Sequence, residues 1–221
     1  MIQLFIIGAG RHAVEVYSYI RDLKGEGRRI KVIGLIDENK PADSWEDTEI
    51  LGDFSVLKAI LNKYKNTKFY YITAVGDNNL RQKFVEKINS FKFKNLLPFT
   101  LIHPSVLIGR NVKIGEGSLV APGCILTTYI KIGRHCIINV KSSISHDCNI
   151  ADFVNINPGV VICGNVNISK GAFIGAGATV IDKIKIGAWS IVGAGSVIIK
   201  DVSSNITVAG VPAERIHYKN K

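Results

Sequence analysis

A histidine and an aspartate stand side by side at His146 and Asp147, and eighteen residues after the histidine the chain carries a glycine, Gly164. An imidazole can remove a proton near neutral pH, and an adjacent carboxylate can raise its basicity. A glycine leaves its backbone N–H open to an incoming oxygen, so it can donate a hydrogen bond to an oxyanion. These residues predict attack on a carbonyl, with His146 as general base and Gly164 as oxyanion donor. The prediction holds only if the fold stacks residues 146 and 164.

A six-residue repeat from 102 to 198 provides that stacking. Starting at Ile102, every sixth residue is Ile, Val or Leu, and many of the residues that follow these aliphatics are glycine. A period of six matches neither a helix nor a flat strand, and it is typical of the hexapeptide parallel β-helix. Three hexads, or eighteen residues, complete one triangular coil. Residues 146 and 164 are therefore expected at the same corner of neighbouring coils, roughly 4.8 Å apart.

The first hundred residues have a different pattern. Apolar runs at 3–7, 31–36 and 69–75 read as strands and alternate with helical patterns that end near residues 23, 64 and 88. This order predicts a parallel sheet built from βαβ units. Pro98 and Pro104 bracket the change of pattern, so we expect a Rossmann-like α/β half-domain at 1–99 and a β-helix with a C-terminal tail at 100–221.

A glycine-rich turn follows the first expected strand. Gly8, Gly10 and Ala13 form a G-x-G-x-x-A pattern that opens a helix, and Asp37 ends the second strand. Backbone N–H groups at such a helix start suit a phosphate, and the acid could contact a nucleoside. A nucleotide-sugar site, an NAD site and a turn that binds nothing remain open, although a β-helix is a poor partner for hydride transfer.

Composition narrows the class of protein. The formal charge is +10, but Lys and Arg are scattered and no nucleic-acid-binding motif is present. No segment reaches the length of a membrane span, and the N-terminus reads as a strand rather than a signal peptide, so a cytoplasmic protein is expected. Cys124, Cys136 and Cys148 fall at inward positions on three different faces. We expect no metal and no nucleic-acid or membrane partner.

Five stretches resemble a known family. They are IIGAGRHAVEV, GLIDENK, LIHPSVLIG, ISHDCNIADFVNINPGVVICGNVNI and AGVPAER. Together they resemble the bacterial sialic acid O-acetyltransferase and UDP-4-amino-sugar N-acetyltransferase family. The resemblance implies a left-handed β-helix, a homotrimer with active sites at subunit interfaces, acetyl-CoA as co-substrate and a nucleotide-linked amino sugar as acceptor.

The resemblance also implies roles for single residues. His146 matches the general base, Asp147 its supporting acid and Gly164 the oxyanion donor. Ala176 and Ala194 match main-chain contacts to coenzyme A. The positions that match the sugar-nucleotide site are Gly10, Arg11, His12, Asp37, Glu38, Gly76, Asp77, Asn78 and Asn79.

Two positions depart from the family pattern. Arg11 replaces a usual glycine, which adds a possible phosphate contact or restricts the turn. Asn155 replaces a histidine that contacts the acetyl thioester in many members. An asparagine can still donate a hydrogen bond there but cannot exchange a proton.

These observations predict N-acetylation of a 4-amino-4,6-dideoxy sugar linked to UDP or dTDP, in bacterial glycan biosynthesis. O-acetylation of sialic acid or another sugar hydroxyl is an alternative, because the same base serves either nucleophile. A non-catalytic scaffold that binds a nucleotide sugar is a second alternative.

Overall fold

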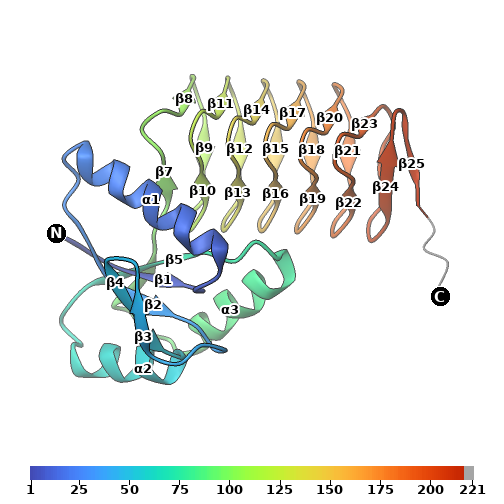
Figure 1. The fold of residues 1–221 in the computed structure, drawn as a ribbon. Helices are drawn as coiled ribbons and strands as arrows, with labels where there is room; N and C mark the ends of the chain where they lie inside the picture. The colour runs from blue at the N-terminus through green and yellow to red at the C-terminus, as the bar shows by residue number, and fades with distance from the viewer. Residues whose placement is uncertain (217–221) are drawn as a thin grey trace. The chain divides into compact units, whose positions relative to one another are not determined.

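The computed structural model describes residues 1–216 and divides the chain into two compact units, Met1–Leu101 and Ile102–Lys221. Figure 1 shows an α/β unit, which contains β1 to β6, and a stack of short parallel strands, which begins at β7.

The first unit is built on one six-stranded sheet, sheet A, in the order β3-β4-β2-β1-β5-β6. Its strands are β1 (Ile2–Ile7), β2 (Ile30–Ile36), β3 (Asp43–Trp45), β4 (Thr48–Gly52), β5 (Phe69–Thr73) and β6 (Leu96–Pro98). All neighbours are parallel except the β3–β4 hairpin. Because β1 pairs with β2 on one side and β5 on the other, the strand order reverses there, and open α/β sheets bind ligands at such a switch point.

Three helices connect these strands: α1 (Arg11–Gly25), α2 (Phe54–Lys63) and α3 (Asn78–Ser90). Each turns an apolar stripe inward, as Val16 and Ile20 do in α1 and Leu57 and Leu61 in α2. The Asp53 carboxylate caps α2 and the Asp77 carboxylate caps α3, whereas Gly10 precedes α1 without a side-chain cap. The start of α1 therefore leaves backbone N–H groups for another acceptor.

The second unit is the expected parallel β-helix, with three sheets that form its sides. Sheet B contains β7 (Leu101–Ile102), β10 (Leu119–Val120), β13 (Ile137–Ile138), β16 (Asn155–Ile156), β19 (Phe173–Ile174), β22 (Ile191–Val192), β24 (Thr207–Gly210) and β25 (Ala213–Arg215). Sheet C contains β8 (Leu107–Ile108), β11 (Ile125–Leu126), β14 (Ser143–Ile144), β17 (Val161–Ile162), β20 (Thr179–Val180) and β23 (Val197–Ile198). Sheet D contains β9 (Lys113–Ile114), β12 (Lys131–Ile132), β15 (Asn149–Ile150), β18 (Asn167–Ile168) and β21 (Lys185–Ile186).

Strand register confirms the eighteen-residue coil. Leu126 pairs with Ile144, and Ile144 pairs with Ile162. The repeated aliphatics fill the interior together with Cys124, Cys136 and Cys148, which are buried free thiols. The cysteines therefore act as small core side chains, as the sequence predicted.

The turns between sheets share one backbone geometry. In every turn from 111 to 195, the third residue after the repeated aliphatic has a positive φ, as at Tyr129 (56°) and Asp147 (61°). The glycines that directly follow the repeated aliphatic are needed for a different reason, which is the close approach of the next coil. A Cβ on Gly133 would lie 2.6 Å from the Ala151 carbonyl carbon in the next coil, so only glycine fits.

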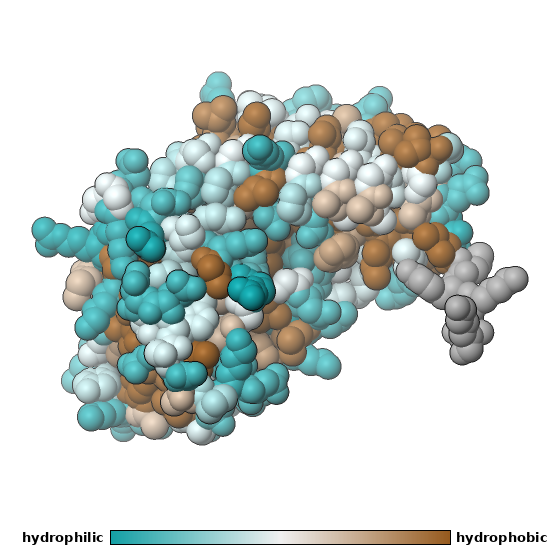
Figure 2. Space-filling model, in the orientation of Figure 1, coloured by the Kyte–Doolittle hydropathy of each residue, from teal (hydrophilic) through white to brown (hydrophobic). Residues whose placement is uncertain are grey.

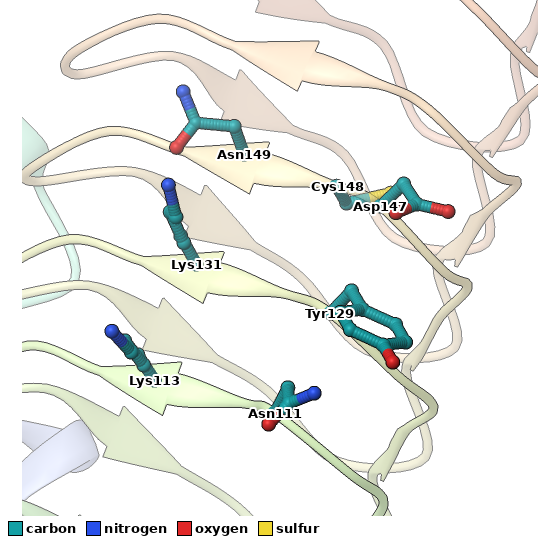
Figure 3. A pocket seen from close by; sticks show the side chains of 7 residues that line it. All are labelled: Asn111, Lys113, Tyr129, Lys131, Asp147, Cys148 and Asn149. Atoms are coloured by element: carbon teal, nitrogen blue, oxygen red, sulfur yellow. The ribbon is translucent and has the colours of Figure 1, made fainter.

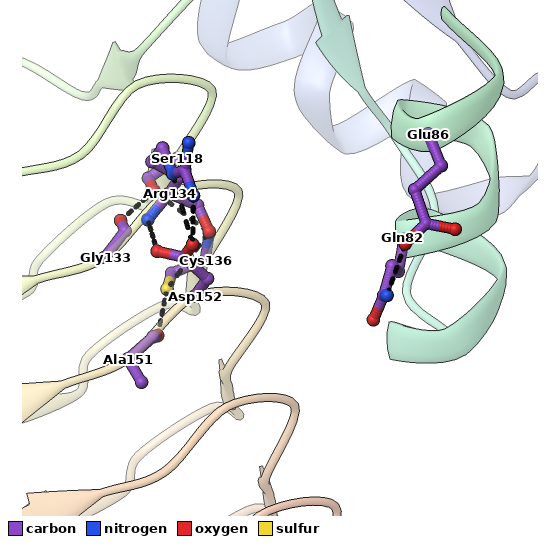
Figure 4. A network of polar contacts seen from close by, with 8 residues as sticks. All are labelled: Gln82, Glu86, Ser118, Gly133, Arg134, Cys136, Ala151 and Asp152. Atoms are coloured by element: carbon purple, nitrogen blue, oxygen red, sulfur yellow. Dashed lines mark hydrogen bonds and ion pairs between the residues drawn. The ribbon is translucent and has the colours of Figure 1, made fainter. Parts of the chain in front are cut away.

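Polar contacts tie successive coils together at the corner between sheets D and B (Figure 4). Ser118 Oγ donates to the Gly133 carbonyl and accepts from the Cys136 N–H, both at 2.9 Å. The Arg134 guanidinium lies 2.8 Å from Asp152 Oδ2, one coil further on. The last coil ends with β24, which extends sheet B, and with β25, which pairs antiparallel to β24. This hairpin forms the C-terminal edge of sheet B.

Candidate active site

His146 and Asp147 lie in the turn between β14 and β15, at the corner between sheets C and D. His146 Nδ1 lies 2.9 Å from Asp147 Oδ2. Because an ionised carboxylate only accepts hydrogen bonds, Nδ1 carries the proton and Nε2 keeps its lone pair. Both side chains are about half exposed, at 56% and 52%. The pair can therefore present a bare imidazole nitrogen to a substrate.

Gly164 stacks on this histidine, as the eighteen-residue spacing predicts. A Cβ at position 164 would lie 2.6 Å from His146 Cε1 and 2.7 Å from Nε2. The His146 ring therefore packs directly against the Gly164 backbone. Gly164 is required for this close approach, which places Nε2 next to its main chain.

The Gly164 N–H is open to an acceptor. No described residue accepts from it, whereas the adjacent N–H groups of Cys163 and Asn165 bond to Val180 O and His146 O, both at 2.9 Å. At the same turn position one corner away, the Arg134 N–H bonds to a carboxylate oxygen of Asp152 at 2.7 Å. An oxygen can thus reach this kind of N–H from outside the coil, and a substrate oxyanion could do so at Gly164.

The expected coenzyme A contacts, Ala176 and Ala194, stack at the corner between sheets B and C. The Gly195 N–H bonds to Ala176 O at 2.8 Å, which fixes this column. Earlier turns place Pro104, Pro122, Val140 and Pro158 at the same position. Proline has no N–H, and the Val140 N–H bonds to Asn139 Oδ1 at 2.8 Å. In the described part of the column, only Ala176 and Ala194 offer open N–H groups.

The two columns do not meet within one chain. His146 and Gly164 lie at one edge of sheet C, and Ala176 and Ala194 lie at its other edge. Asn155 belongs to neither corner, because it is the first residue of β16 in sheet B, where it is 3% exposed. A single chain therefore does not bring Asn155, Ala176 or Ala194 to the histidine.

A second candidate site lies at the switch point of sheet A. A cavity of about 300 Å³ opens where β1, β2 and β5 end. Five predicted substrate-binding residues line it: Gly10, Arg11, His12, Asp37 and Gly76. The sequence did not identify Asn39, Val75, Leu80 or Phe84, which also line it. Arg81 was missed as well; it is fully buried and donates to Val75 O at 2.9 Å, which holds the loop after β5.

His12 lines this cavity, and one of its ring nitrogens is buried without a partner among the described residues. Its Nδ1 lies 3.1 Å from Glu15 Oε2, and its Nε2 is buried without a hydrogen-bond partner in the described structure. Burial lowers the pKa of His12 below its usual value, although Glu15 acts in the opposite direction. The imidazole is therefore neutral at neutral pH, and its Nε2 lone pair suits a hydroxyl or N–H of a ligand better than a phosphate oxygen.

The other predicted residues hold the loops around this cavity. The Asp37 carboxylate accepts from the Ala9 N–H at 2.7 Å and the Asn39 N–H at 2.9 Å. Glu38 pairs with Lys87 on α3, and the Asp77 carboxylate accepts from the Leu80 N–H at 2.7 Å. Asn78 is buried and Asn79 exposed. Among the described residues, the lining does not include Glu38, Asp77, Asn78 or Asn79.

Residues 1–216 contain no group of three His, Cys, Asp or Glu side chains that could hold a metal ion. None of the described helices is both long and apolar enough to cross a membrane.

Comparison with known proteins places these features in one family. The profile of the PglD N-terminal domain matches residues 3–88. The chain is 31% identical over 156 residues to GDP-perosamine N-acetyltransferase of Escherichia coli O157:H7, an alignment that covers 70% of this chain and 66% of that protein.

Solved structures match nearly the whole chain. A histidine-to-asparagine mutant of perosamine N-acetyltransferase from Caulobacter crescentus, in complex with CoA and GDP-perosamine, has a TM-score of 0.87 and 30% identity, with 97% of each chain covered. The acetyltransferase domain of PglB from Neisseria gonorrhoeae, with acetyl coenzyme A, has a TM-score of 0.81 and 28% identity and covers 97% of this chain and 98% of that one.

The chain therefore belongs to the left-handed β-helix sugar acetyltransferases, a family of enzymes whose acyl donor is acetyl-CoA. The fold class and the family resemblance are thereby confirmed. The expected UDP or dTDP nucleotide is not confirmed, because the nucleotide sugar of these two perosamine acetyltransferases is GDP-perosamine.

Proposed function

We propose that this protein transfers the acetyl group of acetyl-CoA to the amine of a nucleotide-linked 4-amino-4,6-dideoxy sugar. The observation that carries the proposal is the stacking of the His146 imidazole on Gly164, with Asp147 Oδ2 2.9 Å from His146 Nδ1. It joins a base and an open backbone donor at one corner.

The reaction follows from these positions. The sugar amine attacks the thioester carbonyl, and His146 Nε2 takes the proton that the amine gives up. The Gly164 N–H donates to the carbonyl oxygen as it becomes an oxyanion. When the carbon–sulfur bond breaks, the proton on His146 can pass to the departing coenzyme A thiolate. Asp147 stabilises the imidazolium that exists between the two proton transfers.

The acceptor is held at the end of sheet A. The cavity of about 300 Å³ is lined by Gly10, Arg11 and His12, at the start of α1, which has no side-chain cap. The helix start and Arg11 suit the diphosphate, and His12 suits a hydroxyl. GDP is the first nucleotide to test, because one relative is a GDP-perosamine N-acetyltransferase and another was solved in complex with GDP-perosamine. UDP and dTDP, which the sequence predicted, are tested next.

A second copy of the chain completes the site. The base and the coenzyme A column occupy opposite edges of sheet C. Between them, the outer face of sheet C exposes Leu107 (65%), Ile125 (43%) and Val161 (41%). Figure 2 shows apolar patches on the surface of the β-helix. A second copy packed on this face would bury the aliphatic side chains. It would also bring the histidine corner of one copy to the coenzyme A corner of the other, as in the homotrimer that the family resemblance implies.

Release of the coenzyme A thiol tests the proposal. The purified protein is given acetyl-CoA with GDP-, UDP- or dTDP-linked 4-amino sugars, and in parallel with free or CMP-linked sialic acid. We expect thiol release and an N-acetylated product with one of the amino sugars. Release only with sialic acid would identify an O-acetyltransferase, and no release with any acceptor would favour the scaffold.

The variant His146→Ala identifies the base. General-base catalysis contributes about 10²- to 10⁴-fold, so kcat should fall by that factor while coenzyme A still binds. Turnover equal to that of the wild type would remove His146 from the mechanism.

A further inference from the structure

A buried thiol belongs to the same turn as the base. Cys148 is adjacent to Asp147 and leads into β15, as Figure 3 shows. Its Sγ lies 3.1 Å from the carbonyl oxygen of Cys163 and 3.6 Å from that of His146. Burial raises the pKa of the Cys148 thiol, so the sulfur keeps its proton at neutral pH and can donate it. The shorter distance assigns this proton to Cys163 O, which belongs to the peptide group whose nitrogen is that of Gly164.

The same contact recurs along the β-helix. In five turns of the described chain, the fourth residue after the repeated aliphatic donates to the carbonyl oxygen fifteen residues further on. The donors are Ser118, Cys124, Cys136, Ser142 and Cys148, and the donor–acceptor distances are 2.9–3.1 Å. A hydrogen bond from a small inward side chain is therefore a regular way to hold a turn peptide of the next coil.

The corner between sheets C and D departs from this regularity. At the position of Cys148, the other described coils at this corner carry branched aliphatic side chains, which cannot donate. These are Val112, Ile130, Val166 and Ile184. The one inward donor in the described part of this corner therefore lies in the coil that contains His146, and its acceptor is the peptide of Gly164.

This hydrogen bond has two consequences for the Gly164 N–H. The peptide between Cys163 and Gly164 is trans, so its carbonyl oxygen and its N–H point in opposite directions. Because Cys163 O faces the thiol in the interior, the N–H faces outward, on the side where the His146 ring packs. Hydrogen bonds in series also polarise one another, so a donor on the carbonyl strengthens the N–H of the same peptide.

The corner between sheets D and B shows the same arrangement with an anion in place. There the Ser118 hydroxyl donates to Gly133 O at 2.9 Å, and the N–H of the same peptide, that of Arg134, donates to Asp152 Oδ1 at 2.7 Å. An inward donor and an outward anionic oxygen thus share one peptide. At Gly164 the oxyanion would occupy the place that the carboxylate takes at Arg134.

We propose that Cys148 is a positioning residue for the oxyanion: its thiol holds the Cys163–Gly164 peptide so that the Gly164 N–H faces the reacting carbonyl. This inference rests on the function proposed above. No bond to the sulfur forms or breaks during turnover, and the thiol acts only through the peptide that it contacts.

Three substitutions of Cys148 test the contact. Cys148→Val removes the donor and introduces a side chain that the same corner already accepts at Val166. Hydrogen-bond cooperativity is about 10–30% per bond, and an oxyanion donor is worth about 10²- to 10³-fold, so kcat should fall about two- to eightfold. KM for both substrates should stay unchanged. Cys148→Ala removes the donor without adding volume and should show the same loss. Cys148→Ser keeps a donor stronger than the thiol, so its kcat should equal or exceed that of the wild type.

Cys136→Val is the matched control. It removes the equivalent bond, from Cys136 Sγ to Ala151 O at 3.0 Å, at a corner that holds neither the base nor the coenzyme A column. Its kcat should be that of the wild type. A loss in Cys148→Val and Cys148→Ala that Cys148→Ser restores supports the proposal. Equal kcat values for the valine and serine variants overturn it, as does an equal loss in Cys136→Val, which would mean a general effect on the coil.

The amide resonance of Gly164 gives a readout without turnover. In protein labelled with ¹⁵N-glycine, this resonance should shift in Cys148→Val and keep its wild-type position in Cys136→Val. If no acceptor is acetylated, the proposed function fails, but the resonance still decides whether the thiol acts on this peptide. A Gly164 resonance that Cys148→Val leaves in place overturns the inference.

Discussion

At the scale of single residues, the reactivity of His146 depends on two neighbours that reach it by different routes. Asp147 is adjacent in the chain, and its φ of 61° belongs to the left-handed region that Asp and Asn tolerate better than most side chains. Gly164 is adjacent only through the coil. One contact fixes the tautomer of the imidazole, and the other holds the ring beside an open N–H.

The variant Gly164→Ala should remove the contact of His146 with Gly164 and leave its contact with Asp147. The new methyl group would lie 2.6 Å from His146 Cε1, so the imidazole must swing away. Alanine keeps the backbone N–H, so the loss is that of the base: we expect kcat to fall about 10²- to 10⁴-fold, with little change in KM for acetyl-CoA. Gly25→Ala is the control, because an added Cβ there meets no atom within 4 Å. If Gly164→Ala keeps its kcat, the stacking has no catalytic role.

At the scale of elements, the β-helix could be predicted because its core repeats every six residues and its stacking follows from arithmetic. That arithmetic alone places His146 against Gly164. The left-handed turn residues were not predictable in the same way, because many of them, such as Lys141, Phe153 and Trp189, are not glycine. Their conformation is imposed by the coil rather than by their own preference.

The α/β unit was harder to predict in detail. Its three long strands and three helices followed from periodicity, but the β3–β4 hairpin did not, because Asp43–Trp45 is short and polar. Of the two substrate-binding residues predicted after β2, only one lines the cavity. Asp37 lines the cavity, yet the carboxylate of Glu38 is engaged by Lys87, which is distant in sequence. Such long-range ion pairs leave no local pattern.

The coenzyme A column makes a second prediction. In Ala194→Pro the N–H is lost, and the turn should accept the ring because Pro104, Pro122 and Pro158 occupy the equivalent position. Loss of one hydrogen bond, about 1 kcal/mol, should raise KM for acetyl-CoA about fivefold and leave the melting temperature unchanged. Ala194→Ser keeps the N–H and should behave as wild type. Equal KM values for the proline and serine variants would exclude this contact.

The ion pair between Arg134 and Asp152 makes the stability of the β-helix depend on pH. Partial burial acts to raise the pKa of Asp152, but hydrogen bonds and charge from Arg134 outweigh it and hold the pKa below its usual value. The folded state thus favours the ionised carboxylate. This stabilisation is full above the unfolded pKa of about 3.9 and is lost as pH falls through the lower folded value.

Asp152→Asn measures that contribution. The variant should be about 1 kcal/mol less stable than wild type at pH 7, and the difference should be smaller at pH 3, below the unfolded pKa. Denaturant unfolding at both pH values gives the comparison. A difference that stays constant between pH 7 and pH 3 would mean that packing or hydrogen bonding, not the charge, accounts for it.

At the scale of the whole molecule, the chain carries a net charge of +10 and is proposed to bind two anionic substrates. The parts to which we assign catalysis are distributed over separate places in the fold. The base lies at the corner between sheets C and D, and the coenzyme A column lies at the corner between sheets B and C. A chain that places these parts on opposite edges of one sheet needs a second copy to bring them together.

Mixing two inactive variants tests this requirement. His146→Ala lacks the base but keeps the N–H column, and the double variant with Ala176→Pro and Ala194→Pro lacks the column but keeps the base. In a mixed assembly, some interfaces join an intact base from one copy to an intact column from the other. In every mixed trimer one of the three interfaces is of this kind, so activity should recover to about one third of the wild-type value. The two variants carry different affinity tags, so tandem purification ensures that only mixed assemblies are assayed, with acetyl-CoA below its wild-type KM.

Each variant assembled alone is the control and should stay near background. Mixed assemblies as inactive as these controls would place the base and the column in the same chain's site, and the second copy would then have no part in catalysis.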